Sequence, residues 1–247
     1  MMKRLLIAMG MLCAICVPFA ASFAQTAQEY FKLGNSAYNK ADYPAAIENY
    51  LEAAKKGGSS AELFYNTANA CAKAGKLSLA ELYYLRAIYA NPRLREASAN
   101  LETLAKDGAL EIPQMGIAQT ALAELSEGEW TALALAAFWG TVLLITIPPL
   151  YGKRSAALAF LAIVCAIVAC VSIAGIFNWR AFASRAVAVG ETPSLRISPA
   201  PEAPVCAILA DGQLAKIRKS RGDFLYLETS NGKRGWGSRS DFEPIGK

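Results

Sequence analysis

The chain has 247 residues, a net charge of +5 and 54% hydrophobic residues, more apolar than a typical soluble protein. It contains no histidine, so the commonest general base and the usual zinc ligand are both missing. The sequence has no dense basic stripe, phosphate-binding loop, nucleophile elbow or metal-ligand spacing. It therefore predicts neither an enzyme nor a nucleic-acid-binding protein, and no cofactor.

Residues 1–24 have the pattern of an export signal. Lys3 and Arg4 precede an apolar run, and small residues stand before a predicted cleavage site between Ala24 and Gln25. An uncleaved anchor is the alternative. Either version exports the residues that follow, so the next domain is expected outside the cytoplasm.

Residues 25–110 contain an internal repeat of 34 residues, with one copy at 27–60 and a second at 61–94. Small residues recur at matching positions, where they let two antiparallel helices approach closely: 34/68, 46/80 and 53/87. Aromatic residues at 30/64 and 50/84 are expected to fill the space between the helices. This pattern predicts an all-α tetratricopeptide solenoid, closed by a capping helix at 95–106.

The first helix of each copy forms the concave face of such a solenoid. The candidate protein-binding residues on this face are Gln28, Phe31, Asn35, Tyr38, Asn39, Tyr65, Asn66, Asn69, Lys73 and Asn100. Asparagine amides can bond the backbone of an extended peptide whatever its sequence. Asparagine is also a common consensus residue of the repeat, and that purely structural role remains open.

Two long uncharged runs follow a linker at 111–129, which contains one short predicted helix. They cover residues 131–150 and 155–177, and each is long enough to span a bilayer. Trp130 and Tyr151 are predicted to be interfacial aromatics at the ends of the first span. The loop at 151–154 carries Lys153 and Arg154, but Arg180 and Arg185 follow the second span, so basic residues alone do not orient the two spans. The exported N-terminus decides: the loop is predicted to be cytoplasmic and both long segments outside.

Residues 186–247 alternate apolar and polar residues in short runs separated by turn signals. The predicted strands are 186–189, 205–209, 214–219, 224–229, 234–238 and a short one near 242. Asn231-Gly232 is the strongest hairpin signal in the chain. A small all-β barrel is expected, with a groove lined by Phe224, Tyr226 and Trp236. The alternative for Trp236 is a place in the core.

Cys71 and Cys206 are the two cysteines outside the apolar runs, one in each predicted domain. Both are expected to be buried, unpaired thiols. A disulfide between them is the alternative, and it would have to link two domains.

The barrel segment resembles the bacterial SH3-like fold, on Leu195-Arg196, Pro199, Gly212 and Gly235-Trp236. The order of export signal, short repeat array, two spans and barrel is similar to the BatE family of the aerotolerance (Bat) operons. The stretches 91–101 and 126–130 resemble that family's exit from the repeats and its approach to the first span. The resemblance implies von Willebrand-type membrane proteins and a MoxR-type ATPase as partners in envelope stress tolerance.

These features together predict a multidomain, two-pass membrane protein of the bacterial inner membrane, with both large segments periplasmic. The leading hypothesis is a non-catalytic scaffold that binds other proteins through its repeats. The first alternative is a cell-wall protein whose SH3-like barrel binds peptidoglycan. A transport or signalling protein is the second, but neither span contains an ionisable residue of the kind that marks a transport pathway.

Overall fold

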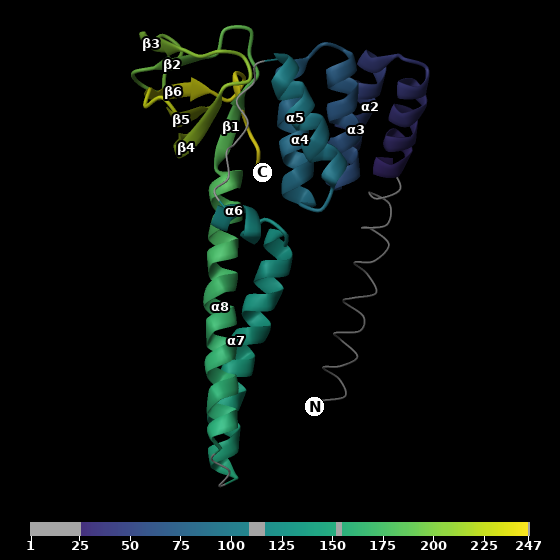
Figure 1. The fold of residues 1–247 in the computed structure, drawn as a ribbon. Helices are drawn as coiled ribbons and strands as arrows, with labels where there is room; N and C mark the ends of the chain where they lie inside the picture. Colours follow the sequence, from purple (N-terminus) through teal and green to yellow (C-terminus); the bar gives the residue numbers. More distant parts are fainter. Residues whose placement is uncertain (1–25, 109–116, 152–154, 247) are drawn as a thin grey trace, which may run out of the picture.

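The computed structural model describes residues 26–108, 117–151 and 155–246. The predicted export signal, with Ala24 and Gln25, and most of the predicted loop lie outside these ranges. Three parts are distinguished below: the repeat module (26–108), the apolar hairpin (127–151 and 155–183) and the sheet module (185–246). Figure 1 shows the repeat module and the sheet module side by side at one end of the hairpin, which projects away from both.

The repeat module consists of antiparallel helices in the predicted register. A first helix covers residues 26–39 and is followed by α2 (Tyr43–Lys55), α3 (Ala61–Lys73), α4 (Leu77–Ala90) and α5 (Arg95–Gly108). Side chains cap two of them: the Asp42 carboxylate accepts from the Ala45 amide, and the Ser60 hydroxyl oxygen accepts from the Leu63 amide. The predicted helical repeat is confirmed, and α5 occupies the place of the capping helix.

The turn inside each copy shows the 34-residue period in the backbone itself. Gly75 ends the α3–α4 turn with a φ of 75°, and Ala41 at the equivalent position of copy one has a φ of 59°. Glycine adopts this left-handed conformation freely, whereas a Cβ makes it costly. Ala41 is therefore a strained position that the sequence alone marks only as a weak helix breaker.

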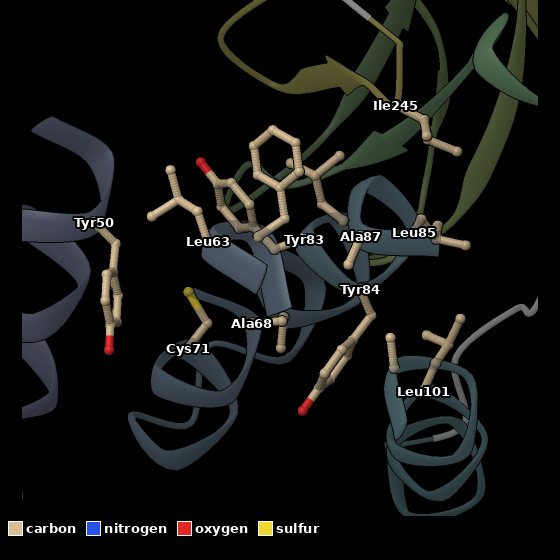
Figure 2. Packing of buried hydrophobic residues seen from close by; sticks show 14 of the residues in the cluster. Tyr50, Leu63, Ala68, Cys71, Tyr83, Tyr84, Leu85, Ala87, Leu101 and Ile245 are labelled. Atoms are coloured by element: carbon tan, nitrogen blue, oxygen red, sulfur yellow. The ribbon is translucent and has the colours of Figure 1, made fainter. Parts of the chain in front are cut away.

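The core of the repeat module lies between the paired helices. The predicted small residues are buried, with Ala46, Ala68 and Ala80 fully enclosed, and the rings of Tyr50 and Tyr84 fill the spaces beside them. Figure 2 shows these rings in one core with Ala68, and Ile245 of the sheet module lies against the same cluster. The core thus continues from the repeats into the sheet module.

The apolar hairpin begins after a short helix, α6 (Ile117–Leu122), and consists of α7 (Glu127–Leu150) and α8 (Ala156–Ala183). Both helices are long and apolar enough to cross a membrane. Large apolar side chains such as Trp139, Ile145 and Phe160 are exposed on them. Each helix is longer than the apolar run that predicted it, because polar residues extend the end nearer the two modules.

The sheet module is one antiparallel sheet of seven strands in the order β3-β2-β6-β5-β4-β1-β7. The strands are β1 (Arg185–Ala188), β2 (Ser194–Arg196), β3 (Val205–Ile208), β4 (Leu214–Arg221), β5 (Phe224–Thr229), β6 (Arg234–Ser238) and β7 (Phe242–Pro244). Leu225, Leu227 and Phe242 form its separate core. The sequence missed β2, which has only three residues, and it ended β4 two residues too early.

Two tryptophans hold the base of the hairpin: Trp179 joins it to the repeat module, and Trp130 joins α7 to the short helix α6. Trp179 is fully buried, packs edge-on against Tyr89 with ring centroids 5.8 Å apart, and donates its Nε1–H to the Leu125 carbonyl at 2.6 Å. Trp130 is also buried, and its Nε1–H bonds the Leu122 carbonyl at 2.9 Å. The ring of Trp130 packs against Gly175 of α8 and is covered by protein, whereas Tyr151 at the other end of α7 is exposed. Their place at a membrane interface stays a prediction.

Arg86 joins the repeat module to the sheet module. Its Nη2 donates to the Glu243 carboxylate at 3.0 Å and to the Pro244 carbonyl at 2.8 Å. Its guanidinium also lies over the Tyr83 ring, 5.1 Å from the centroid. Because the Arg86 side chain is only 12% exposed, this contact holds a charge at a mostly desolvated interface.

Candidate functional site

A hollow of about 300 Å³ opens on the concave face of the repeat module. Its lining consists of amides and phenols and carries no charged side chain: Asn35, Tyr38, Asn39, Tyr50, Asn66 and Asn69. We call it the amide hollow. The first helix and α3 supply the five residues that the sequence predicted, and α2 supplies Tyr50. The helical period brings these side chains together, since residues three or four apart share one face.

Two equivalent hydrogen-bonded triads run along this face. In the first, the Asn35 Oδ1 accepts from the Tyr50 hydroxyl at 2.7 Å and from the Asn66 Nδ2 at 3.3 Å. The second triad follows one repeat later: the Asn69 Oδ1 accepts from the Tyr84 hydroxyl at 2.6 Å and from the Asn100 Nδ2 at 3.1 Å.

Each triad engages only part of the hydrogen-bonding capacity of its amides. Among the described residues, the Asn35 Nδ2 and the Asn66 Oδ1 have no hydrogen-bond partner. A primary amide can make up to four hydrogen bonds. One half of the Asn35 and Asn66 amides therefore orders the fold, and the other half is left without a partner on two residues that line the hollow.

The phenols of this face stay neutral at physiological pH. Burial raises the pKa of Tyr50 and of Tyr84 to about 12. Burial first, and then neighbouring Tyr43, raise the pKa of Tyr38 as well. The triads consequently offer hydroxyl and amide groups but no ionised ones, which suits a ligand that is polar and uncharged.

The remaining predicted residues of the concave face lie around the amide hollow. Gln28 and Phe31 line a second hollow of about 260 Å³, beside the α2–α3 loop. The Asn100 Nδ2 also donates to the Tyr65 hydroxyl at 3.3 Å, which extends the second triad. Lys73 is exposed at the end of α3 and lines neither hollow.

Sequence reasoning missed Tyr50 as a site residue. It predicted Tyr50 and Tyr84 only as space-filling aromatics, and both are indeed buried. The available signal was the constant spacing: an asparagine precedes each of these tyrosines by 15 residues, as Asn35 and Asn69 do. Each of these tyrosines therefore has two roles, because its ring fills the core and its hydroxyl belongs to the concave face.

The predicted aromatic groove of the sheet module lies on the outer face of the sheet. Tyr226 and Trp236 stand on neighbouring strands with ring centroids 5.3 Å apart, and Phe224 is further along the same face of β5. Trp236 is half-buried and lies outside the core of the sheet module, so the alternative that it is a core residue is wrong. Beside it, the Glu228 carboxylate pairs with Arg218 and Arg234.

The two cysteines of the modules are both free thiols. Cys71 is buried in the repeat core, where burial raises its pKa to about 12. Cys206 is exposed on β3, so the prediction of a buried thiol is wrong there. It stands on an edge strand, which leaves one side of the residue uncovered. No cluster of potential metal ligands occurs within the described ranges.

No protein-family model matches the chain, and no curated protein matches it. Among solved structures, the Caenorhabditis (C. elegans) SMG5–SMG7 complex is similar over 65% of this chain and 46% of that chain, at 15% identity and a TM-score of 0.33. This chain thus spans less than half of the length of that structure. The class defined by the fold is a helical-repeat protein joined to an antiparallel sheet module and an apolar helical hairpin.

Proposed function

We propose that this chain is a non-catalytic, membrane-anchored scaffold, whose tetratricopeptide array binds an extended polypeptide of a partner protein in the amide hollow. The observation that carries the proposal is the pair of equivalent Asn–Tyr–Asn triads on the concave face. In the first triad, half of the hydrogen-bonding groups of Asn35 and Asn66 are held by the fold and half have no partner among the described residues, so donors and acceptors in the lining of the hollow are ordered before a ligand arrives. Preorganised groups bind with a smaller entropy cost.

The chemistry of the amide hollow favours a peptide backbone over a charged terminus. An extended chain presents amide N–H and carbonyl groups on both sides, and asparagine side chains can pair with both kinds. A terminal carboxylate would need a lysine or arginine in the lining, and none is present there. We therefore propose that the ligand is an internal, uncharged and extended segment.

Membrane anchoring is supported by the apolar hairpin. Its exposed large side chains would be costly to hydrate, and a bilayer of about 30 Å matches helices of this length. We propose a two-pass protein of the bacterial inner membrane with both modules in the periplasm, because the export pattern of residues 1–24 places the repeat module outside and two spans return the chain to the same side. Alkaline phosphatase fused after Lys247 should be active, and a fusion at Lys153 should be silent. Activity at Lys153 alone would invert this topology.

The sheet module is proposed to be an SH3-like barrel, and the whole chain a BatE-like component of an aerotolerance system. Its sequence motifs around Leu195 and Trp236 and the order of its parts support this. By that resemblance, the expected partners are von Willebrand-type membrane proteins and a MoxR-type ATPase system.

The test of peptide binding needs a change that leaves the triads intact. Replacing Asn35 and Asn66 together would strand the buried Tyr50 hydroxyl and confuse folding with binding. Asn39 is exposed at the mouth of the amide hollow, so Asn39→Glu places a charge there without breaking a hydrogen bond of the described chain. The matched control is Asn49→Glu on α2, whose amide bonds only its own helix.

Partners would be crosslinked in membranes and identified by mass spectrometry for the wild type and each variant. We expect Asn39→Glu to lose the partner, and both Asn49→Glu and Trp236→Ala to keep it. The alternative function, peptidoglycan binding, rests on the half-buried Tyr226–Trp236 pair with Arg218 and Arg234 beside it. Loss of the partner only in Trp236→Ala would favour that function and move the main site to the sheet module.

A further inference from the structure

The β4–β5 hairpin begins beside the junction between α8 and the sheet module. Strand β1 continues directly from α8, and β4 runs antiparallel to it, with Arg185 paired to Lys216. The Ile217 amide donates to the carbonyl of Ser184, the residue that caps α8, at 2.7 Å. The residues of β4 beyond that point therefore start near this junction, and Figure 1 shows β4 on the side of the sheet module nearer to the apolar hairpin.

The end of α8 that β4 passes is close to the apolar surface of that helix. The Ile217 amide of β4 bonds the Ser184 carbonyl directly after α8. From Arg185 back to Phe177, the last large exposed apolar residue of α8, is eight residues, or about 12 Å at about 1.5 Å each. The part of the sheet module that contains β4 thus begins about 12 Å above the apolar surface of α8.

This end of the sheet module is basic and partly aromatic. Lys219, Arg221 and Arg239 are exposed there, and Phe224 is half-buried beside them. The Arg239 guanidinium bonds the Ser220 hydroxyl and the Gly222 carbonyl, so it is fixed at the turn. We call these four residues the basic tip: Lys219, Arg221, Phe224 and Arg239.

The charge of the basic tip is not cancelled by the surrounding elements. Strands β4, β5 and β6 carry five basic residues and one acid, Glu228, which already pairs with Arg218 and Arg234. Asp223 at the turn and Asp241, two residues after Arg239, are the acids near the tip in the sequence, two against three basic residues. The acids at the start of α7 are also paired, Glu127 with Arg180 and Glu129 with Arg93.

We propose that the basic tip is a lipid-binding site, which contacts anionic phospholipid headgroups of the bilayer that holds the apolar hairpin. Basic side chains next to an anionic surface each strengthen binding about fivefold, and aromatic side chains favour the same interfacial layer. The inference rests on the proposed membrane anchoring and adds a second contact with the lipid. That contact would hold the sheet module, and through Arg86 the repeat module, at a fixed height above the membrane.

The test uses the full chain in lipid nanodiscs, with Phe224 replaced by photoreactive p-benzoylphenylalanine. Discs of phosphatidylcholine are compared with discs that also contain phosphatidylglycerol, and lipid adducts are measured by mass spectrometry. We expect adducts at position 224 chiefly in the anionic discs. The probe placed at Asn231, in the turn at the other end of β5, should give none.

Charge variants then identify the groups responsible. Lys219→Gln with Arg221→Gln should lower the ratio of adduct to free chain in anionic discs by about 25-fold, from about fivefold per charge. The matched control, Lys40→Gln with Lys233→Gln, removes the same charge from surfaces away from the tip and should change nothing.

Each failure has a distinct meaning. Equal adduct formation in neutral and anionic discs, or an unchanged ratio in the double variant, would overturn the lipid-binding site alone. A chain that does not insert into either kind of disc would overturn the membrane anchoring as well. Partner capture through the amide hollow is measured separately and would stand in the first case.

Discussion

In Gly34→Ala, helix propensity and packing have opposite effects on stability, and the structure shows which effect is larger. Alanine in a helix interior is more favourable than glycine by about 1 kcal/mol, so propensity alone predicts a gain in stability. A Cβ at residue 34, however, would lie 2.5 Å from two ring carbons of Tyr50. That ring is fully enclosed, and its hydroxyl is bonded to Asn35, so it cannot move away without losing the bond.

The steric clash is expected to outweigh the gain in helix propensity. Overpacking costs about 1–3 kcal/mol and a strained hydrogen bond about 1 kcal/mol more, so after the gain of about 1 kcal/mol the net effect is a loss of about 1–3 kcal/mol. Hydrogen exchange of the full chain in detergent, followed by mass spectrometry, would report this locally. Amides of the first helix and α2 should exchange about tenfold faster. Ser36→Ala on the exposed side gains propensity without a clash and should not accelerate them. Slower exchange in Gly34→Ala would refute the packing argument.

Three further predictions concern the backbone, the interface and pH. Ala41 and Gly75 both have a positive φ, which glycine adopts more easily than alanine. Ala41→Gly should therefore stabilise copy one by about 0.5–1 kcal/mol, and Gly75→Ala should destabilise copy two. Local rates of amide hydrogen exchange would measure both effects. Arg86→Ala should weaken the contact between the repeat module and the sheet module by about 2 kcal/mol, because it leaves Glu243 and a carbonyl unpaired. Limited proteolysis should then separate the sheet module. An unchanged cleavage pattern would contradict this. Finally, burial raises the pKa of Tyr50 to about 12, so the neutral phenol stabilises the folded state. This stabilisation is complete below pH 10 and is lost between about pH 10 and 12. Alkaline unfolding followed by circular dichroism would check it.

The repeat module could be predicted because its information is local and periodic. Small residues at 46 and 80 and aromatics at 50 and 84 recur at the same spacing, and the helices follow from that pattern. The concave asparagines were predicted for the same reason. Their pairing with Tyr50 and Tyr84 was not, since a spacing of 15 residues across a turn does not say which way a ring points.

The junctions could not be predicted because they join residues far apart in the chain. Arg86 and Glu243 are separated by 157 positions, and neither stands in a motif. Trp130 follows the pattern of an interfacial aromatic, an uncharged run with a tryptophan at its end, yet a tertiary contact with Gly175 and Leu122 determines its place. β2 was missed because three residues do not carry a measurable alternation.

The junction also bears on how the repeat module can act as a scaffold. Helix α4 contacts α8 through Tyr89 and the sheet module through Arg86, so two independent contacts orient one helix of the repeats. A single contact would leave a rotation free, whereas two contacts on different elements remove it. The amide hollow therefore keeps one direction relative to the apolar hairpin. A partner anchored in the same membrane would meet a groove that is already oriented, and an oriented site loses less rotational freedom on binding.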